Sequence, residues 1–193
     1  LDKVGLIEPD FKNNGLLDFL AIVEKHIGNF NVRANADQER DALVAKEFKA
    51  DGIGLCRTEH MFFNEKRIMK FREMIIAETV EERQKALDLL KPMQRSDFYE
   101  LFKSMSGKPV TIRLLDAPLH EFLPRSESSM NEFVKYMQTR KKNIKSSDID
   151  ARCEELAEMN PMLGHRGCRV AVTYPEIYEM QCRAIFEAAC MLR

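Results

Sequence analysis

The sequence lacks the features that would place it in a membrane or on nucleic acid. No apolar run approaches the roughly 20 residues that a membrane-spanning helix requires, and no signal peptide is visible at its start. An excess of charge is also missing, since the formal net charge is −1 at pH 7. An electrostatic nucleic-acid binder would be strongly basic. There is no repeat of fixed period and no low-complexity segment, so we expect a globular protein.

Metal-binding cysteine spacing is absent as well. The five cysteines are scattered and include no Cys-x-x-Cys pair, so structural zinc is not predicted. An odd, scattered set favours reduced thiols and a cytoplasmic location. Cys56 and Cys168 lie near the arginines considered below, and we expect them to be small packing residues rather than nucleophiles. The four histidines have no metal-ligand spacing among themselves.

The apolar pattern alternates between strand and helix periodicity. Strands are predicted at 30–34, 52–57 and 109–116, with a strand or turn at 162–167. Helices are predicted at 15–27, 38–49, 66–77, from 79 onward, at 96–105, 130–141 and 148–158, and from 173 onward. Asp37 is a plausible N-cap for the second of these helices. Thr79–Glu82 and Thr173–Glu176 have capping-box spacing.

A strand, a short helix and a second strand within about 30 residues form a βαβ unit, which implies parallel pairing. Parallel strands alternating with helices leave an open doubly wound sheet or a (β/α)8 barrel. Neither glycine-rich nucleotide-binding motif occurs in the sequence. Their absence weakens the open-sheet alternative.

Polar residues follow the predicted strands at the end where barrel enzymes carry their chemistry. Arg57, Arg113 and Arg166 each follow a short apolar segment, and Asn35 and Asp116 fall at the same edge. Clustered guanidinium groups repel one another, so three of them predict an anion, either phosphate or carboxylate. Asp116 has two open interpretations, as a group that orients Arg113 or a metal-bound water, or as a turn-capping residue.

The neighbouring His120-Glu121 and Glu59-His60 pairs could act as acid or base. With no partner visible in the sequence, structural or supporting roles are favoured for them.

Three segments carry a family resemblance. Gly52–Phe63, Val110–Phe122 and Asn160–Glu176 closely resemble the pyruvate, phosphate dikinase family of PEP-utilising enzymes, in the first half of its C-terminal barrel. Val32–Asp37 is similar to the first barrel strand. The resemblance implies an α/β fold, a partial (β/α)8 TIM barrel of about the first four β/α units. Extra helices are expected in the second-to-third and third-to-fourth strand connections. Residues 1–29 would be a linker and lead-in helix, and residues 30–193 the N-terminal half of the barrel domain.

The resemblance also implies a reaction. Members of the family interconvert pyruvate, ATP and phosphate with phosphoenolpyruvate, AMP and diphosphate, through a phosphohistidine on a separate domain. By analogy Arg57, Arg113 and Asp116 are catalytic. The substrate-binding set would be Arg57, Arg113, Arg166 and Asn35. Phosphoryl transfer depends on positioning and on neutralising charge, which arginine forks supply. The implied partners are phosphoenolpyruvate or pyruvate, the phosphohistidine domain and a second copy in a homodimer, without nucleic acid or membrane.

Several family parts have no match in this sequence. The Mg²⁺ ligands, the cysteine general acid and the carrier histidine are expected outside the chain, so no metal ligand is assigned in it. We therefore expect a piece of a longer enzyme with no turnover alone, and with open strand edges that favour self-association. Two alternatives stay open. One is the barrel of phosphoenolpyruvate synthase or of enzyme I of the sugar phosphotransferase system, and the other is a non-catalytic anion-binding module.

Overall fold

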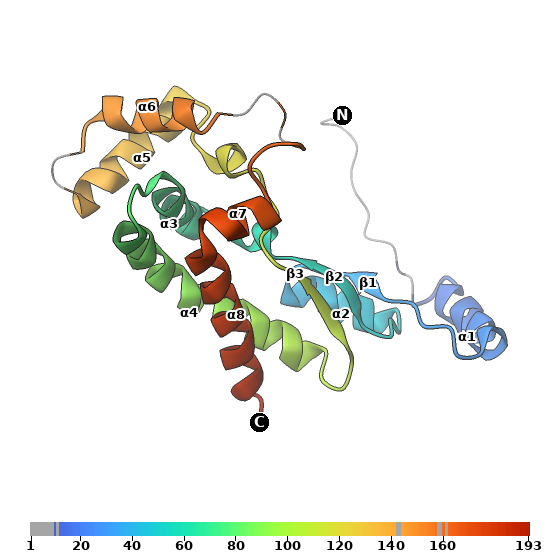
Figure 1. Cartoon of the computed structure of the whole chain (residues 1–193). Helices are drawn as coiled ribbons and strands as arrows, with labels where there is room; N and C mark the ends of the chain where they lie inside the picture. Colours follow the sequence, from blue (N-terminus) through green and yellow to red (C-terminus); the bar gives the residue numbers. More distant parts are fainter. Residues whose placement is uncertain (1–9, 11, 142–143, 158–159, 161) are drawn as a thin grey trace, which may run out of the picture.

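A three-stranded parallel sheet lies at the centre of the chain, with helices around it (Figure 1). The computed structural model describes residues 10, 12–141, 144–157, 160 and 162–193. Of the predicted lead-in segment, residues 1–9 and 11 lie outside the described residues. So do residue 158 of a predicted helix and Pro161 in the third family segment.

The sheet consists of β1 (Ala34–Asn35), β2 (Ile53–Arg57) and β3 (Val110–Arg113), in that order. Both pairings are parallel, which confirms the parallel α/β prediction. The first strand is shorter than predicted, because Phe30 and Val32 are 69% and 57% exposed and have no packed face to hold them in a strand.

No strand forms at 162–167, where the sequence allowed a strand or a turn. The described residues there form turns, and the side chains of Met162 and Leu163 are 72% and 77% exposed. A strand needs a partner and a buried face, and these apolar side chains have neither burial nor a neighbouring strand. Within the described residues the sheet therefore has three strands rather than the four expected.

The helices mostly follow the predicted positions. They are α1 (Leu16–Ile27), α2 (Glu39–Glu47), α3 (Glu65–Ile76), α4 (Val80–Ser104), α5 (Glu127–Arg140), α6 (Ser146–Glu155), α7 (Cys168–Thr173) and α8 (Pro175–Cys190), with 3-10 turns η1 (Thr58–Phe62) and η2 (Leu119–Phe122). Figure 1 shows α5 and α6 grouped at one end of the molecule and α1 beyond the β1 edge of the sheet. No residue of α1 is buried.

One helix, α4, replaces the two that were predicted in its span. It continues through Pro92, although an interior proline removes a hydrogen bond and costs about 3 kcal/mol. Leu90, Gln94 and Phe98 are fully buried on both sides of that proline. Burial of this continuous stripe against α3 and α8 offsets the local cost.

Two predicted caps are wrong. Gln38, not Asp37, is the N-cap of α2, and the carboxylate of Asp37 binds Arg57 instead. Thr173 does not cap α8, because its hydroxyl donates to the carbonyl of Arg169. By contrast, the Thr79 hydroxyl accepts from the nitrogen of Glu82 at 3.2 Å, as predicted.

The helices α4 and α8 pack along each other and build much of the core. Buried side chains from both helices join the cluster that covers the sheet, including Phe98 and Ala184. Ion pairs clamp the same interface, with Glu187 accepting from Lys91 and from Arg95, each at 2.9 Å. Among the described residues, no helix is long and apolar enough to cross a membrane.

Candidate functional site

Two of the predicted arginines are register partners across the sheet. Arg57 ends β2, Arg113 ends β3, and the two residues pair in the parallel register. Both strands run the same way, so both side chains leave the sheet at its carboxyl edge. The expected convergence of these two arginines is confirmed.

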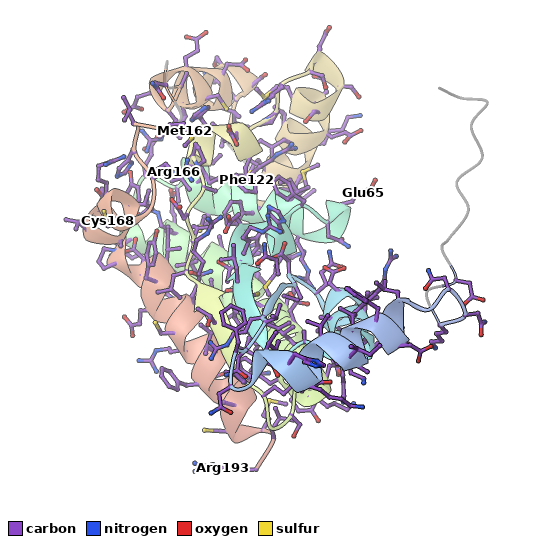
Figure 2. All side chains as sticks on the ribbon, turned by 90° about the vertical axis from the view of Figure 1, so that its right-hand side faces the viewer. Glu65, Phe122, Met162, Arg166, Cys168 and Arg193 are labelled. Carbon is purple, nitrogen blue, oxygen red and sulfur yellow. The ribbon has the colours of Figure 1, made fainter. Side chains whose placement is uncertain are left out.

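Arg166 reaches the same region by another route. It lies in the turn before α7 rather than at a strand end. Its Nε donates to Oδ1 of Asp116 at 2.9 Å, and a second guanidinium nitrogen donates to the Asp116 carbonyl at 3.0 Å. The hydrogen bond and charge of Asp116 raise the pKa of Arg166 above its ordinary value. In Figure 2 Arg166 lies beside Met162, whose sulfur is 3.6 Å from the guanidinium.

Asp116 lies between two of the arginines. Its Oδ1 accepts from Arg166, and its Oδ2 is 4.0 Å from a guanidinium nitrogen of Arg113. The geometry favours the orienting interpretation of Asp116. Arg166, from a later segment of the chain, is a closer partner of Asp116 than Arg113 is.

Each arginine already has a carboxylate partner. Arg57 pairs with Asp37 at 3.0 Å, Arg113 pairs with Glu59, and Arg166 pairs with Asp116. Carboxylates of the protein itself therefore supply negative charge beside each guanidinium, and a bound phosphate or carboxylate anion stays a prediction. An arginine fork has five donors, and a single carboxylate uses only some of them.

Asp37 is the residue that the sequence did not assign to the site. It is 6% exposed, and Oδ1 accepts from the backbone nitrogen of Arg57 at 2.7 Å. Burial raises the pKa of Asp37, but hydrogen bonds and charge from Arg57, with a contribution from His60, outweigh burial and leave the pKa below its ordinary value. A residue placed 20 positions before its partner gives no local sequence signal.

His60 shares the same carboxylate. Its Nδ1 lies 2.9 Å from Oδ2 of Asp37, which supports the predicted supporting role of the Glu59-His60 pair. Glu59 is 6% exposed. Its Oε2 and the Nε of Arg113 are buried without hydrogen-bond partners among the described residues.

A cavity of about 710 Å³ adjoins part of this cluster. Its lining includes Arg113, Asp116, Arg166 and Arg169, with Tyr178 of α8 behind them. Asn35 is elsewhere. It is exposed and lines a separate cavity of about 750 Å³ beside α1 and α2. The structure thus brings Arg113, Asp116 and Arg166 together at one cavity. Arg57 does not line that cavity but ends the neighbouring strand in register with Arg113, and Asn35 lines a different cavity.

The prediction that Cys56 and Cys168 are packing residues is confirmed for Cys56 and wrong for Cys168, which is exposed. Cys56 is fully buried in β2, and burial raises the pKa of its thiol to about 12. All five cysteines are free.

A metal ion does not fit the residues present. Among the described residues, no three His, Cys, Asp or Glu side chains are grouped to hold one. Each of the three carboxylates of the cluster instead pairs with a guanidinium group through at least one of its oxygens.

Comparison with known proteins decides the family. A sequence model of the PEP-binding domain of PEP-utilising enzymes matches residues 13–193. The chain belongs to the PEP-utilising enzyme family. This confirms the resemblance drawn from the three sequence segments.

Relatives of this PEP-utilising chain share its sequence closely. Pyruvate, phosphate dikinase of Treponema pallidum (strain Nichols) is 53% identical over 189 residues, covering 97% of this chain and 21% of the relative. The enzyme of that name from Rhizobium meliloti (strain 1021) is 57% identical over 158 residues, 82% of this chain and 17% of the relative. The chloroplastic pyruvate, phosphate dikinase 1 of Arabidopsis thaliana is 52% identical over 167 residues, which cover 86% of this chain and 17% of the relative. The chain spans about a fifth of the length of these curated relatives.

Proposed function

We propose that this chain is the arginine-bearing part of the phosphoenolpyruvate or pyruvate site of a pyruvate, phosphate dikinase. The observation that carries the proposal is the group formed by Arg113, Asp116 and Arg166 at one cavity, in a chain about half identical to named dikinases. The relatives' names favour this over the synthase, over enzyme I and over a non-catalytic module.

The arginines would act by neutralising charge. A transferring phosphoryl group spreads negative charge over three equatorial oxygens, and guanidinium forks bind such oxygens in pairs. Arg113 and Arg166 line the cavity, so they would meet the anion directly. Arg57, held by buried Asp37, supports the Arg113 strand end from the neighbouring strand.

The carboxylates prepare the site and also limit it. Asp37, Glu59 and Asp116 orient the three arginines before an anion arrives, so little reorganisation is needed when it binds. Three arginines paired with three carboxylates carry no net charge as a group. The anion therefore meets well-placed donors rather than a strong positive field, and the chain alone should bind it weakly.

The remaining parts of the site belong to the same proposal. Any Mg²⁺ that the assembled site uses would take its ligands outside the described residues, since those present do not fit one. We propose that the three-stranded sheet is the first portion of a (β/α)8 barrel beginning near residue 30. The phosphohistidine domain, a homodimeric partner and a reducing cytoplasmic setting are the further elements proposed around it.

Calorimetric titration with phosphoenolpyruvate tests the proposal. The wild-type chain should bind with a dissociation constant in the millimolar range, about −4 kcal/mol. Arg113→Ala and Arg166→Ala should abolish the heat. Arg183→Ala serves as the matched control, because Arg183 pairs with Glu179 on the exposed side of α8.

Three results would contradict it. Equal affinity in Arg113→Ala and Arg183→Ala would remove the arginine cluster from the binding site. Dikinase turnover by the chain alone would refute the predicted incompleteness. A wild-type chain that binds no phosphoenolpyruvate would show that these residues do not form the site by themselves.

A further inference from the structure

A fully buried glutamine on α8 joins the two strand ends that carry arginines. Oε1 of Gln181 accepts from the backbone nitrogen of Leu115 at 2.8 Å, and Nε2 donates to the Thr58 hydroxyl at 3.1 Å. That hydroxyl in turn donates to the carbonyl of Arg113 at 3.0 Å. Gln181 and Thr58 are both 0% exposed, so no water replaces these contacts.

A tyrosine one turn earlier on α8 joins the third segment. The hydroxyl of Tyr178 lies 2.6 Å from the Leu115 carbonyl and 2.8 Å from the Gly167 carbonyl. It has one proton, so it donates to one carbonyl at a time while staying within reach of both. Leu115 follows Arg113 by two positions, and Gly167 follows Arg166 directly.

The two side chains share one face of α8, because residues three apart on a helix are neighbours. Thr58 directly follows Arg57, so Tyr178 and Gln181, here termed the α8 bracket, contact backbone or hydroxyl groups of all three arginine-bearing segments. Tyr178 also lines the arginine cavity.

The helix that carries the bracket is itself held firmly. Near its start Glu176 accepts from the buried Arg83 at 2.8 Å, and near its end Glu187 pairs with Lys91 and Arg95. All three basic partners are on α4. The strand ends at Arg57 and Arg113 are already paired in the sheet. A fixed helix with two side chains that each contact two groups can set the positions of the residues just beyond those ends and of the Arg166 turn, which is in no strand.

We propose that Tyr178 and Gln181 are positioning residues, which hold the segments of Arg57, Arg113 and Arg166 at the spacing required by a bound phosphoryl or carboxylate anion. The inference rests on the proposed function. Neither residue needs to touch the anion. Their effect is on where the guanidinium forks lie, and a displacement near 1 Å is enough to weaken such a site substantially.

The first measurement needs no ligand. Nitrogen-15 NMR of arginine Nε–H groups in the chain reports the surroundings of each guanidinium separately, with Arg→Lys variants assigning the signals. Gln181→Met should shift the signals of Arg57 and Arg113. Tyr178→Phe, which removes a single oxygen, should shift that of Arg166. The Arg183 signal should stay in place in both variants.

Two matched controls separate positioning from a general loss of stability. Gln94→Met makes the same change at another fully buried glutamine, whose nitrogen is 3.9 Å from the Met61 sulfur. Tyr136→Phe removes a hydroxyl that bonds Glu73 at 2.7 Å, between α5 and α3. Tyr136→Phe should lower the melting temperature, and Gln94→Met should change it little, because Oε1 of Gln94 has no hydrogen-bond partner among the described residues. Neither variant should move the three arginine signals.

The second measurement is phosphoenolpyruvate affinity by calorimetry. Each bracket variant should bind phosphoenolpyruvate with an affinity that is lower by roughly tenfold or more, while the controls keep wild-type affinity. Unmoved arginine signals in both bracket variants would overturn the inference whatever the affinity. Moved signals with unchanged affinity would also overturn it.

Failure of the proposed function gives a different pattern. If the wild-type chain binds no phosphoenolpyruvate but the bracket variants still move the arginine signals, the bracket stands and the site assignment falls. If the affinity decreases equally in Tyr178→Phe and Tyr136→Phe, the positioning role of the α8 bracket is rejected and the site assignment is kept.

Discussion

The carboxylate of Asp37 holds both the backbone and the side chain of Arg57. Oδ1 accepts from the Arg57 backbone nitrogen at 2.7 Å, and Oδ2 accepts from its Nε at 3.1 Å. The contact fixes the end of β2 and the direction of the guanidinium together. It also pairs the charge of Arg57, as Glu59 and Asp116 do for Arg113 and Arg166.

Asp37→Asn should destabilise the chain near neutral pH by about 1.5–3 kcal/mol, the range for hydrogen bonds to charged groups. The folded-state pKa of Asp37 is lowered from 3.8, so its contribution is present above that pH and is lost as pH falls through the lower folded value. The difference in unfolding free energy between wild type and variant should therefore shrink in strong acid. Urea unfolding across acidic and neutral pH measures it.

The control for Asp37→Asn is Asp88→Asn, at an exposed carboxylate on α4. It should change the unfolding free energy little at any pH. An Asp37→Asn difference that stays constant down to the acid end would exclude the charged contact as its source.

Gly167→Ala should disturb the Arg166–Asp116 pair. Gly167 has φ of +53°, and a Cβ there would lie 2.9 Å from Oδ1 of Asp116, the atom that accepts from Arg166. Backbone strain of this kind costs about 1–3 kcal/mol, and the close contact adds displacement of Asp116. Urea unfolding should show a lower free energy of unfolding, and phosphoenolpyruvate titration should show a weaker affinity.

Gly107→Ala is the matched control, with φ of +79° and no atom within 4 Å of the added carbon. It should show the strain cost alone and keep its ligand affinity. Equal effects on affinity at the two glycines would argue against crowding of Asp116.

Arg83→Met should be the most destabilising of the substitutions considered. Arg83 is 3% exposed, donates to the Ala77 carbonyl at 2.6 Å and lies over the Tyr174 ring at 4.0 Å. Removing it leaves Glu176 uncompensated at a nearly buried position, a loss of about 3–5 kcal/mol. Thermal unfolding measures the change.

The double variant Arg83→Met with Glu176→Gln should recover part of that loss, since the unpaired charge is gone. Arg183→Met, at an exposed ion pair, should change stability by no more than about 0.5 kcal/mol. Additive losses in the double variant would show that the two side chains do not act as a pair.

Cys56 should resist alkylation at neutral pH, because its pKa of about 12 leaves almost no thiolate and the side chain is buried. The exposed Cys168 and Cys190 should react first. Mass spectrometry after brief iodoacetamide treatment of the folded chain gives the order. Early modification of Cys56 would mean that β2 opens more readily than its burial indicates.

Local patterns predicted most of the secondary structure for identifiable reasons. Helical spacing and the Thr79 cap placed the start of α4. A short apolar segment placed β2, and alternating residues placed β3. The failures lie where long-range packing overrides local preference. Pro92 lies inside a helix because Leu90, Gln94 and Phe98 are buried around it, and Phe30 lies outside a strand because nothing covers it.

The sequence by itself determined the family and predicted the three arginines of the cluster, because the motifs that carry them are contiguous segments of the chain. Only the tertiary structure decided how the charges are paired. Asp37 meets Arg57 across 20 positions, and Gln181 meets Thr58 across 123. It also placed Asn35 on a different cavity. Such contacts depend on how the strands and α8 pack in space. The separation of two residues along the chain does not show how close folding brings them.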